Sequence, residues 1–202
     1  INTIKEEFLI LEPNLSIEIS EVVSPEKVMD LGVQEGFIKS IYAALNGVYK
    51  MSPVVEGLVE TSNNIARIIV KNGAIKIGCL TRSSSESNKI DLANSLRSVF
   101  ELSGFEVKFS GTYPGWQPNV NSEIVSIVAN IYEELHGEKA NIAACHAGLE
   151  CGILGQNYPK MDMVSFGPNI KGAHSPDERA QISSTQKFWN FLVEILKNIP
   201  KK

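Results

Sequence analysis

Two of the three histidines and two of the three cysteines of this chain lie in two short segments, which also contain Glu150 and Glu178. The segments are CHAGLECG at residues 145–152 and GAHSPDE at residues 172–178. Each follows a short apolar run that the pattern predicts as a strand, at 142–145 and 161–166. Because ligands gather beyond the carboxyl ends of the strands in an open parallel sheet, we expect the two segments to form one wall of an active site. Imidazole and carboxylate groups together favour a metal ion as the bound group.

His174 is the candidate metal ligand. Neutral imidazole is a common zinc ligand, and the nearby carboxylates of Asp177 and Glu178 could hold its second ring nitrogen in the required tautomer. In the alternative interpretation His174 is a surface residue beside a helix start, with Asp177 and Glu178 as ordinary acids of the first turn. A single histidine does not make a metal site.

Four other residues are candidates for substrate binding. Glu150 could hold a cationic group such as a peptide amino terminus, and His146 could support it. Arg82 follows an apolar strand and could hold a carboxylate through two parallel hydrogen bonds. Asn64 could donate a hydrogen bond to a carbonyl oxygen. Each also has an ordinary structural interpretation. Glu150 and Arg82 could be solvated charged residues, His146 could be a loop histidine, and Asn64 could be a turn residue.

The composition is that of a soluble globular protein, with 43% hydrophobic and 21% charged residues among 202. No apolar run approaches the ~20 residues of a membrane span, and a net charge of -4 gives no basic surface for nucleic acid. Three cysteines without a framework-like spacing indicate thiols in a reducing compartment. The chain starts at Ile1 within a helical pattern, which we interpret as a piece of a longer polypeptide.

The residues before about 110 predict an α+β sandwich of two layers. Asn72-Gly73 is the strongest short hairpin signal, and it separates two apolar runs. The expected strands are 15–23, 54–60, 65–70, 74–80 and 105–109, and the expected helices are 33–45 and 89–103.

The residues from about 111 predict an α/β arrangement. The pattern has a helix at 122–136, the two short strands 142–145 and 161–166, and a closing helix that starts near Ser183 in capping-box form. Cys145 is expected to be a small buried hydrophobic residue.

Several long motifs resemble those of the aminoacyl-histidine (Xaa-His) dipeptidases, which belong to a superfamily of di-zinc exopeptidases. They are YPGWQP at 113–118, HAGLECG at 146–152, YPxMDMVSxGP at 158–168 and HSPDE at 174–178, with looser matches VETS at 59–62 and LTRS at 80–83.

This resemblance implies an α/β fold made of two parts. Residues 1–110 would be the later part of an inserted α+β two-layer lid, which carries the dimer contact in this superfamily. Residues 111–202 would be the second, carboxyl-terminal segment of the α/β/α catalytic domain. The parent protein would be a cytoplasmic, homodimeric metallo-dipeptidase with a small peptide substrate and no nucleic-acid or membrane partner.

The resemblance also implies residue roles. His174 would be the last zinc ligand, Arg82 and Asn64 would bind the substrate carboxylate and carbonyl, and residues 146–152, with His146 and Glu150, would line the substrate pocket. Two zinc ions, or manganese or cobalt, would assist the hydrolysis of dipeptides, preferentially Xaa-His.

The chain departs from the family pattern in one large respect. It contains no His-x-Asp motif, and its Glu-Glu pairs lie in helical contexts. We therefore expect the general base and most metal ligands upstream, no catalytic residue within this chain, and no activity of the fragment alone. Three alternatives stay open: another di-zinc peptidase or deacylase, a non-catalytic lid or dimerisation module, and a cysteine hydrolase that uses Cys145.

Overall fold

The computed structural model describes residues 1–146 and 150–200, in two compact units, Ile1–Gln34 and Glu35–Lys202. The first unit contains helix α1 (Asn2–Phe8) and the start of helix α2 (Leu31–Ala43). Asp30 Oδ1 accepts hydrogen bonds from the backbone N–H groups of Gly32 and Val33 at 2.9 and 3.2 Å, which caps the start of α2. Both helices agree with the sequence pattern. None of the helices in the described residues combines the length and the apolar character that a membrane span requires.

The predicted strand at 15–23 is wrong. This segment has no regular secondary structure. A strand exists only where a second strand accepts and donates its backbone hydrogen bonds, and within the described residues 15–23 pairs with none.

The residues before about 110 contain a three-stranded antiparallel sheet, in the order β1-β2-β3. Its strands are β1 (Gly47–Met51), β2 (Val59–Lys71) and β3 (Ala74–Ser83). The hairpin predicted at Asn72-Gly73 is confirmed: Lys71 pairs with Ala74, and the two turn residues have φ of 53° and 74°. Positive φ at both positions is the geometry of a type I′ turn.

The predicted strand at 54–60 is wrong in most of its length. The N–H groups of Val54 and Val55 donate to Ser52 Oγ at 3.3 and 3.1 Å, so the chain turns there instead of extending. The strand pairing moves to β1 before the turn and to β2 from Val59 onward.

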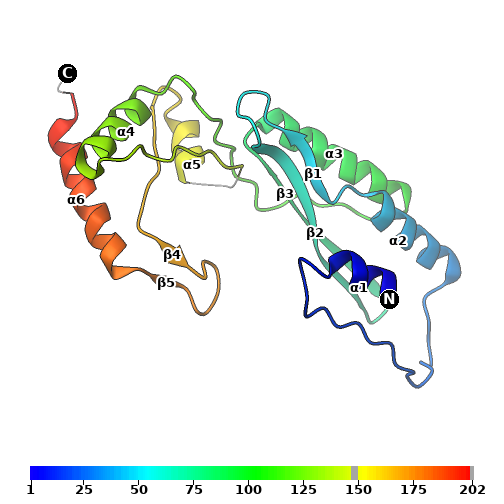
Figure 1. The fold of residues 1–202 in the computed structure, drawn as a ribbon. Coiled ribbons are helices and arrows are strands. Elements are labelled where there is room, and N and C mark those ends of the chain that lie inside the picture. Colours follow the sequence, from blue (N-terminus) through cyan, green and yellow to red (C-terminus); the bar gives the residue numbers. More distant parts are fainter. Residues whose placement is uncertain (147–149, 201–202) are drawn as a thin grey trace. The chain divides into compact units, whose positions relative to one another are not determined.

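Helix α3 (Glu86–Leu102) lies along this sheet (Figure 1) and closes a hydrophobic core. Ala44, Leu92, Leu96 and Phe100 are buried there, with partly buried side chains of the strands packed against them. The predicted helix at 89–103 and the two-layer α+β arrangement agree with this packing. Residues 105–109 do not form a strand, although Phe105 and Val107 pack against the same core.

A second core lies between helices α4 (Glu123–His136) and α6 (Ile182–Asn198). Its buried residues are Val128, Ile131, Phe191 and Ile195. Gly137 ends α4 in the left-handed conformation, as its position after the last apolar residue predicts. The predicted capping box at Ser183 is wrong, because α6 already begins at Ile182 with Gln181 as its N-cap.

The chain between these two helices is less regular than the α/β pattern predicted. The expected strands 142–145 and 161–166 are unpaired within the described residues. The sequence pattern did not predict helix α5 (Glu150–Asn157) or the short hairpin formed by β4 (Ile170–Lys171) and β5 (Arg179–Ala180). Cys145 is exposed, so the expectation that it is buried is wrong. The mixed α/β class itself is confirmed.

Candidate functional site

Strand β2 presents two different rows of polar side chains. Thr61 and Asn63 are buried, with exposed fractions of 0% and 3%. Because successive side chains of a strand point to opposite faces, Ser62 and Asn64 lie on the other, open face. Ser62 is half-buried and Asn64 is exposed there.

The register of the hairpin adds Arg82 to this open face. Ser62 pairs directly with Arg82, and Asn64 pairs with Leu80. Residues that oppose each other in an antiparallel pair share a face of the sheet. Asn64 and Arg82, which the sequence analysis named as candidate substrate-binding residues, therefore lie on one surface.

His146 reaches the same surface from the other half of the chain. Its Nε2 lies 2.8 Å from Ser62 Oγ, a hydrogen bond between residues 84 positions apart. A pocket of about 430 Å³ results, lined by Val48, Ser62, Asn64, Leu80, Arg82 and His146 together with Asn46, Gly47, Val59 and Asn63. The structure thus brings three of the four predicted substrate-binding residues together.

The electrostatics of the pocket suit an anionic ligand. Burial, followed by the positive charge of Arg82, lowers the pKa of His146 below its ordinary value of 6.5. The imidazole is therefore neutral at pH 7 and keeps one donor and one acceptor nitrogen. Arg82 supplies the positive charge and a planar fork of donors that matches a carboxylate.

Hydrogen bonds on the buried face hold the strands beneath this pocket. Thr61 Oγ1 and Ser83 Oγ are 2.7 Å apart. Asn63 Nδ2 donates to the carbonyl oxygen of Leu45 at 2.7 Å, and Thr81 Oγ1 donates to Asn63 Oδ1 at 3.0 Å. In the described part of the chain every buried side-chain nitrogen and oxygen has a partner. A fully satisfied network of this kind fixes the positions of its strands.

Two glycines join the end of β3 to helix α5 by direct backbone contact. A Cβ on Gly115 would lie 2.5 Å from the carbonyl oxygen of Ser84, and one on Gly152 would lie 2.6 Å from that of Pro114. Backbone atoms cannot move aside as a flexible side chain can, so these positions need glycine. We call this backbone contact the glycine seam. It holds the start of α5 close to the strand that carries Arg82.

His174 and Glu150 lie outside the set of residues that lines the pocket. His174 has φ of 64° in the loop between β4 and β5, and its backbone N–H donates to Glu178 Oε2 at 2.8 Å. The expected carboxylate partner therefore binds the backbone of His174 rather than its ring. Glu150 is exposed at the start of α5, and residues 147–149 of the same motif lie outside the described residues.

The described residues do not form a metal site by themselves. Residues 1–146 and 150–200 contain no group of three or more His, Cys, Asp and Glu side chains placed to share an ion. His174 can supply one imidazole nitrogen, which is too few donors for a structural or catalytic zinc ion.

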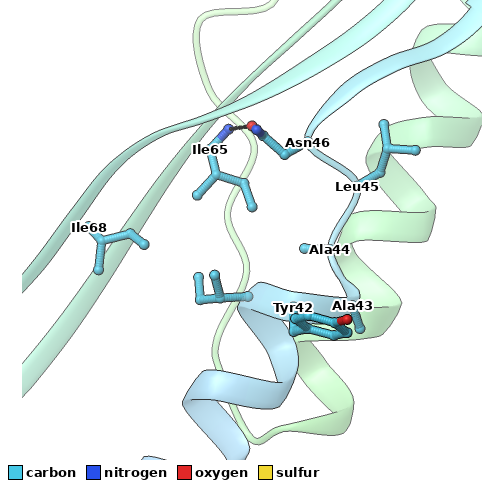
Figure 2. Close-up of a pocket in the computed structure, with 8 residues that line it drawn as sticks. Tyr42, Ala43, Ala44, Leu45, Asn46, Ile65 and Ile68 are labelled. Atoms are coloured by element: carbon cyan, nitrogen blue, oxygen red, sulfur yellow. Dashed lines mark hydrogen bonds between the residues drawn. The ribbon is translucent and has the colours of Figure 1, made fainter. Parts of the chain in front are cut away.

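A second pocket, of about 700 Å³, is chemically different (Figure 2). It lies between the end of α2 and β2, where Asn46 Oδ1 accepts a hydrogen bond from the N–H of Ile65 at 2.8 Å. Its lining is mostly apolar and includes Ile41, Ala44, Leu45 and Ile68. Because it has no carboxylate, imidazole or guanidinium group, we place the candidate site at the pocket of Arg82 and His146.

Comparison with known proteins gives the family. The family model described as Peptidase family M20/M25/M40 matches residues 7–198. The chain belongs to this family. The M20/M25/M40 match spans both the part of the chain with the three-stranded sheet and the part with α4 and α6.

Two relatives within this family are dipeptidases. The chain is 39% identical to the cytosol non-specific dipeptidase of Escherichia coli K12 over 199 aligned residues. The alignment covers 98% of this chain and 41% of that protein. The chain is 43% identical to aminoacylhistidine dipeptidase of Vibrio alginolyticus, whose crystal structure it matches with a TM-score of 0.84 over 100% of this chain and 41% of that one. The chain thus spans about two-fifths of the length of these relatives.

A more distant structure shares the fold alone. Aminopeptidase PepT of Bacillus cereus matches with a TM-score of 0.65 at 15% identity, over 83% of this chain and 45% of that one.

Sequence reasoning missed Ser62 as a pocket residue. The signal was present, because Ser62 lies two positions before Asn64 in an alternating strand and therefore on the same face. What the sequence alone could not provide was the register that sets Ser62 against Arg82, or the contact with a loop 84 residues away.

Proposed function

We propose that this chain is the carboxyl-terminal portion of a metallo-dipeptidase that hydrolyses dipeptides, preferentially Xaa-His. The observation that carries this proposal is the pocket in which Arg82, Asn64 and His146 meet on one face of the sheet. Two dipeptidases align with nearly the whole chain, and one of them is named for aminoacylhistidine substrates. That agreement supports the same class of substrate here.

Each side chain has a distinct part in binding the peptide. The guanidinium group of Arg82 holds the terminal carboxylate through parallel hydrogen bonds. The amide of Asn64 and the neutral imidazole of His146 donate to carbonyl or carboxylate oxygens of the substrate. Glu150, at the start of α5, binds the free amino group.

The metal centre is completed by residues outside this chain. His174 would supply one imidazole ligand, and the other ligands and the general base would come from the upstream part of the protein. A zinc ion held there, or manganese or cobalt in its place, would supply Lewis-acid activation of the scissile carbonyl and of the attacking water.

The two hydrophobic cores support the proposed division of the protein. One core uses residues between 41 and 107, and the other uses residues between 124 and 195. We assign residues 1–110 to the lid and residues 111–202 to the catalytic domain. The edge strand β1 is exposed along its length, with Val48 52% and Met51 47% exposed, which favours a homodimer through the lid. A cytoplasmic location would match the cytosol dipeptidase of Escherichia coli.

The test is hydrolysis by the protein extended upstream to the length of its relatives. Zinc-dependent cleavage of an Xaa-His dipeptide is expected, faster than that of matched dipeptides without histidine. His174→Ala should reduce kcat/KM by more than about 100-fold, since even residues that only support metal ligands contribute about 10–100-fold.

The matched control is His136→Gln, because His136 ends α4 and contacts the rings of Tyr132 and Phe191, away from the pocket. This control should retain activity. An inactive extended protein, or a fully active His174→Ala variant, would overturn the proposal.

A further inference from the structure

We propose that Ser62 is a positioning residue, whose hydroxyl fixes the orientation of the His146 ring within the substrate pocket. This inference rests on the proposed dipeptidase function and deepens it. The contact that carries it is the 2.8 Å hydrogen bond between Ser62 Oγ and His146 Nε2.

The local backbone does little to orient His146. The eight residues from Glu138 to Cys145 have no helix or strand hydrogen bonding. Among the described residues, Ser62 is the hydrogen-bond partner of the ring. A side chain on such a segment keeps its rotamer only if tertiary contacts hold it.

Ser62 itself is held firmly. Its neighbours Thr61 and Asn63 are buried on the opposite face, where they bond to Ser83, Thr81 and the backbone of Leu45. Its cross-strand partner is Arg82, so the hydroxyl and the guanidinium group are fixed by one strand register. A rigid support of this kind is what a binding side chain requires to keep its geometry.

The bond also assigns the two ring nitrogens. Nε2 is occupied by the hydroxyl, so Nδ1 is the nitrogen left for the substrate. Burial, and to a smaller extent the charge of Arg82, lowers the pKa of His146 and so favours the neutral ring. Since a serine hydroxyl both donates and accepts, Ser62 can support whichever tautomer the substrate oxygen or amide requires.

The test is a double-mutant cycle on the extended protein with an Xaa-His dipeptide. Ser62→Ala should raise KM about three- to tenfold, the usual effect of one hydrogen bond, with a smaller change in kcat. Ser62→Thr keeps the hydroxyl and should restore KM to within about twofold. In a His146→Ala background, Ser62→Ala should have no further effect, because the two side chains act as a unit.

A second measurement does not depend on activity. Diethyl pyrocarbonate acylates neutral imidazole nitrogens, and peptide mass spectrometry reports the rate at His146 alone. Ser62→Ala should speed this modification severalfold, while Ser62→Thr and Ser98→Ala should not. Ser98 is the matched control, because its hydroxyl bonds to the carbonyl oxygen of Asn94 within α3.

The possible outcomes separate the two proposals. If the wild-type protein cleaves dipeptides but the Ser62 and His146 effects add independently, Ser62 is not a positioning residue and the dipeptidase assignment stands. If no dipeptide is cleaved but the modification rate at His146 rises only in Ser62→Ala, the positioning role stands and the proposed function fails. An unchanged modification rate in Ser62→Ala would overturn the inference in either case.

Discussion

Arg82 carries the positive charge of the pocket, and its planar shape has a measurable consequence. Arg82→Lys keeps the charge but loses the two parallel hydrogen bonds, so KM of the extended enzyme should rise about tenfold with a smaller change in kcat. Steady-state kinetics on a dipeptide series gives both values. Arg67→Lys is the control, because Arg67 lies on the same strand as Ser62 but outside the pocket lining. Equal effects of the two variants would contradict the assigned role of Arg82.

His146 makes the stability of the protein depend on pH. Burial and Arg82 lower the pKa of His146 in the folded state, while the unfolded chain keeps the ordinary value of 6.5. Below about pH 6.5 the unfolded state therefore binds more protons than the folded state. The free energy of unfolding consequently decreases as the pH falls from there toward the lowered pKa. His146→Gln should lose less stability than the wild type between about pH 7.5 and about pH 5.5. Urea unfolding at the two pH values measures this, and an equal loss in both proteins would count against it.

Ser122 and Asp162 together cap helix α4. Ser122 Oγ accepts from the N–H of Val125 at 3.2 Å and donates to Asp162 Oδ2 at 2.8 Å, which also accepts from the N–H of Ile124 at 3.1 Å. Ser122→Ala should destabilise α4 by about 1–2 kcal/mol, the usual effect of losing an N-cap. Amide hydrogen exchange in peptides from α4 should accelerate accordingly. Ser98→Ala in α3 should leave α4 exchange unchanged, and acceleration in both variants would point to a nonspecific effect.

The glycine seam predicts different stabilities for two glycine-to-alanine variants. Gly115→Ala would force a Cβ against the backbone of Ser84, so it should cost about 1–3 kcal/mol of stability. Gly167→Ala is the matched control, because its added Cβ would meet nothing within 4 Å. Urea unfolding of the extended protein compares the two. If Gly115→Ala is as stable as Gly167→Ala, the backbone of Ser84 leaves room for a side chain at position 115, and the seam does not require glycine there.

The sequence predicted correctly those helices and turns that are specified by their own residues. Helix α4, with Gly137 after it, and the Asn72-Gly73 hairpin are specified by their own residues, and both were predicted. The segments 15–23 and 142–145 have suitable apolar patterns but are unpaired within the described residues. A strand depends on a partner that no local pattern supplies, so these were predicted wrongly.

The site shows the same division. Arg82, Asn64 and His146 came from motifs of a known family, and their meeting in one pocket required the fold. Ser62 was not recognised, because its importance depends on a strand register and a contact across 84 residues.

At the scale of the whole molecule, the proposed metal centre predicts how the extended enzyme responds to a chelator. Because the proposal puts the general base and most metal ligands upstream of this chain, we expect the 202 residues alone to show no hydrolysis with or without zinc. The extended enzyme should lose activity on dialysis against a chelator and regain it when zinc is added. Activity that survives chelation would exclude a dissociable metal cofactor. Activity of the 202-residue chain alone would show that it is not the incomplete part of an enzyme.

The type I′ turn at Asn72-Gly73 has a consequence for how this sequence can change by insertion or deletion. The turn pairs Lys71 with Ala74, and a one-residue register shift between Ile65 and Arg67 then places Ser62 opposite Arg82 on the open face. Removing one residue between Arg67 and Asn72, with the irregularity at Ile65–Arg67 retained, would shift the pairing by one position and exchange the two rows of β2. Thr61 and Asn63 would then face the pocket, and Ser62 and Asn64 would enter the core. Single substitutions along this strand change one contact each, whereas a deletion that shifts the register would replace the whole binding surface.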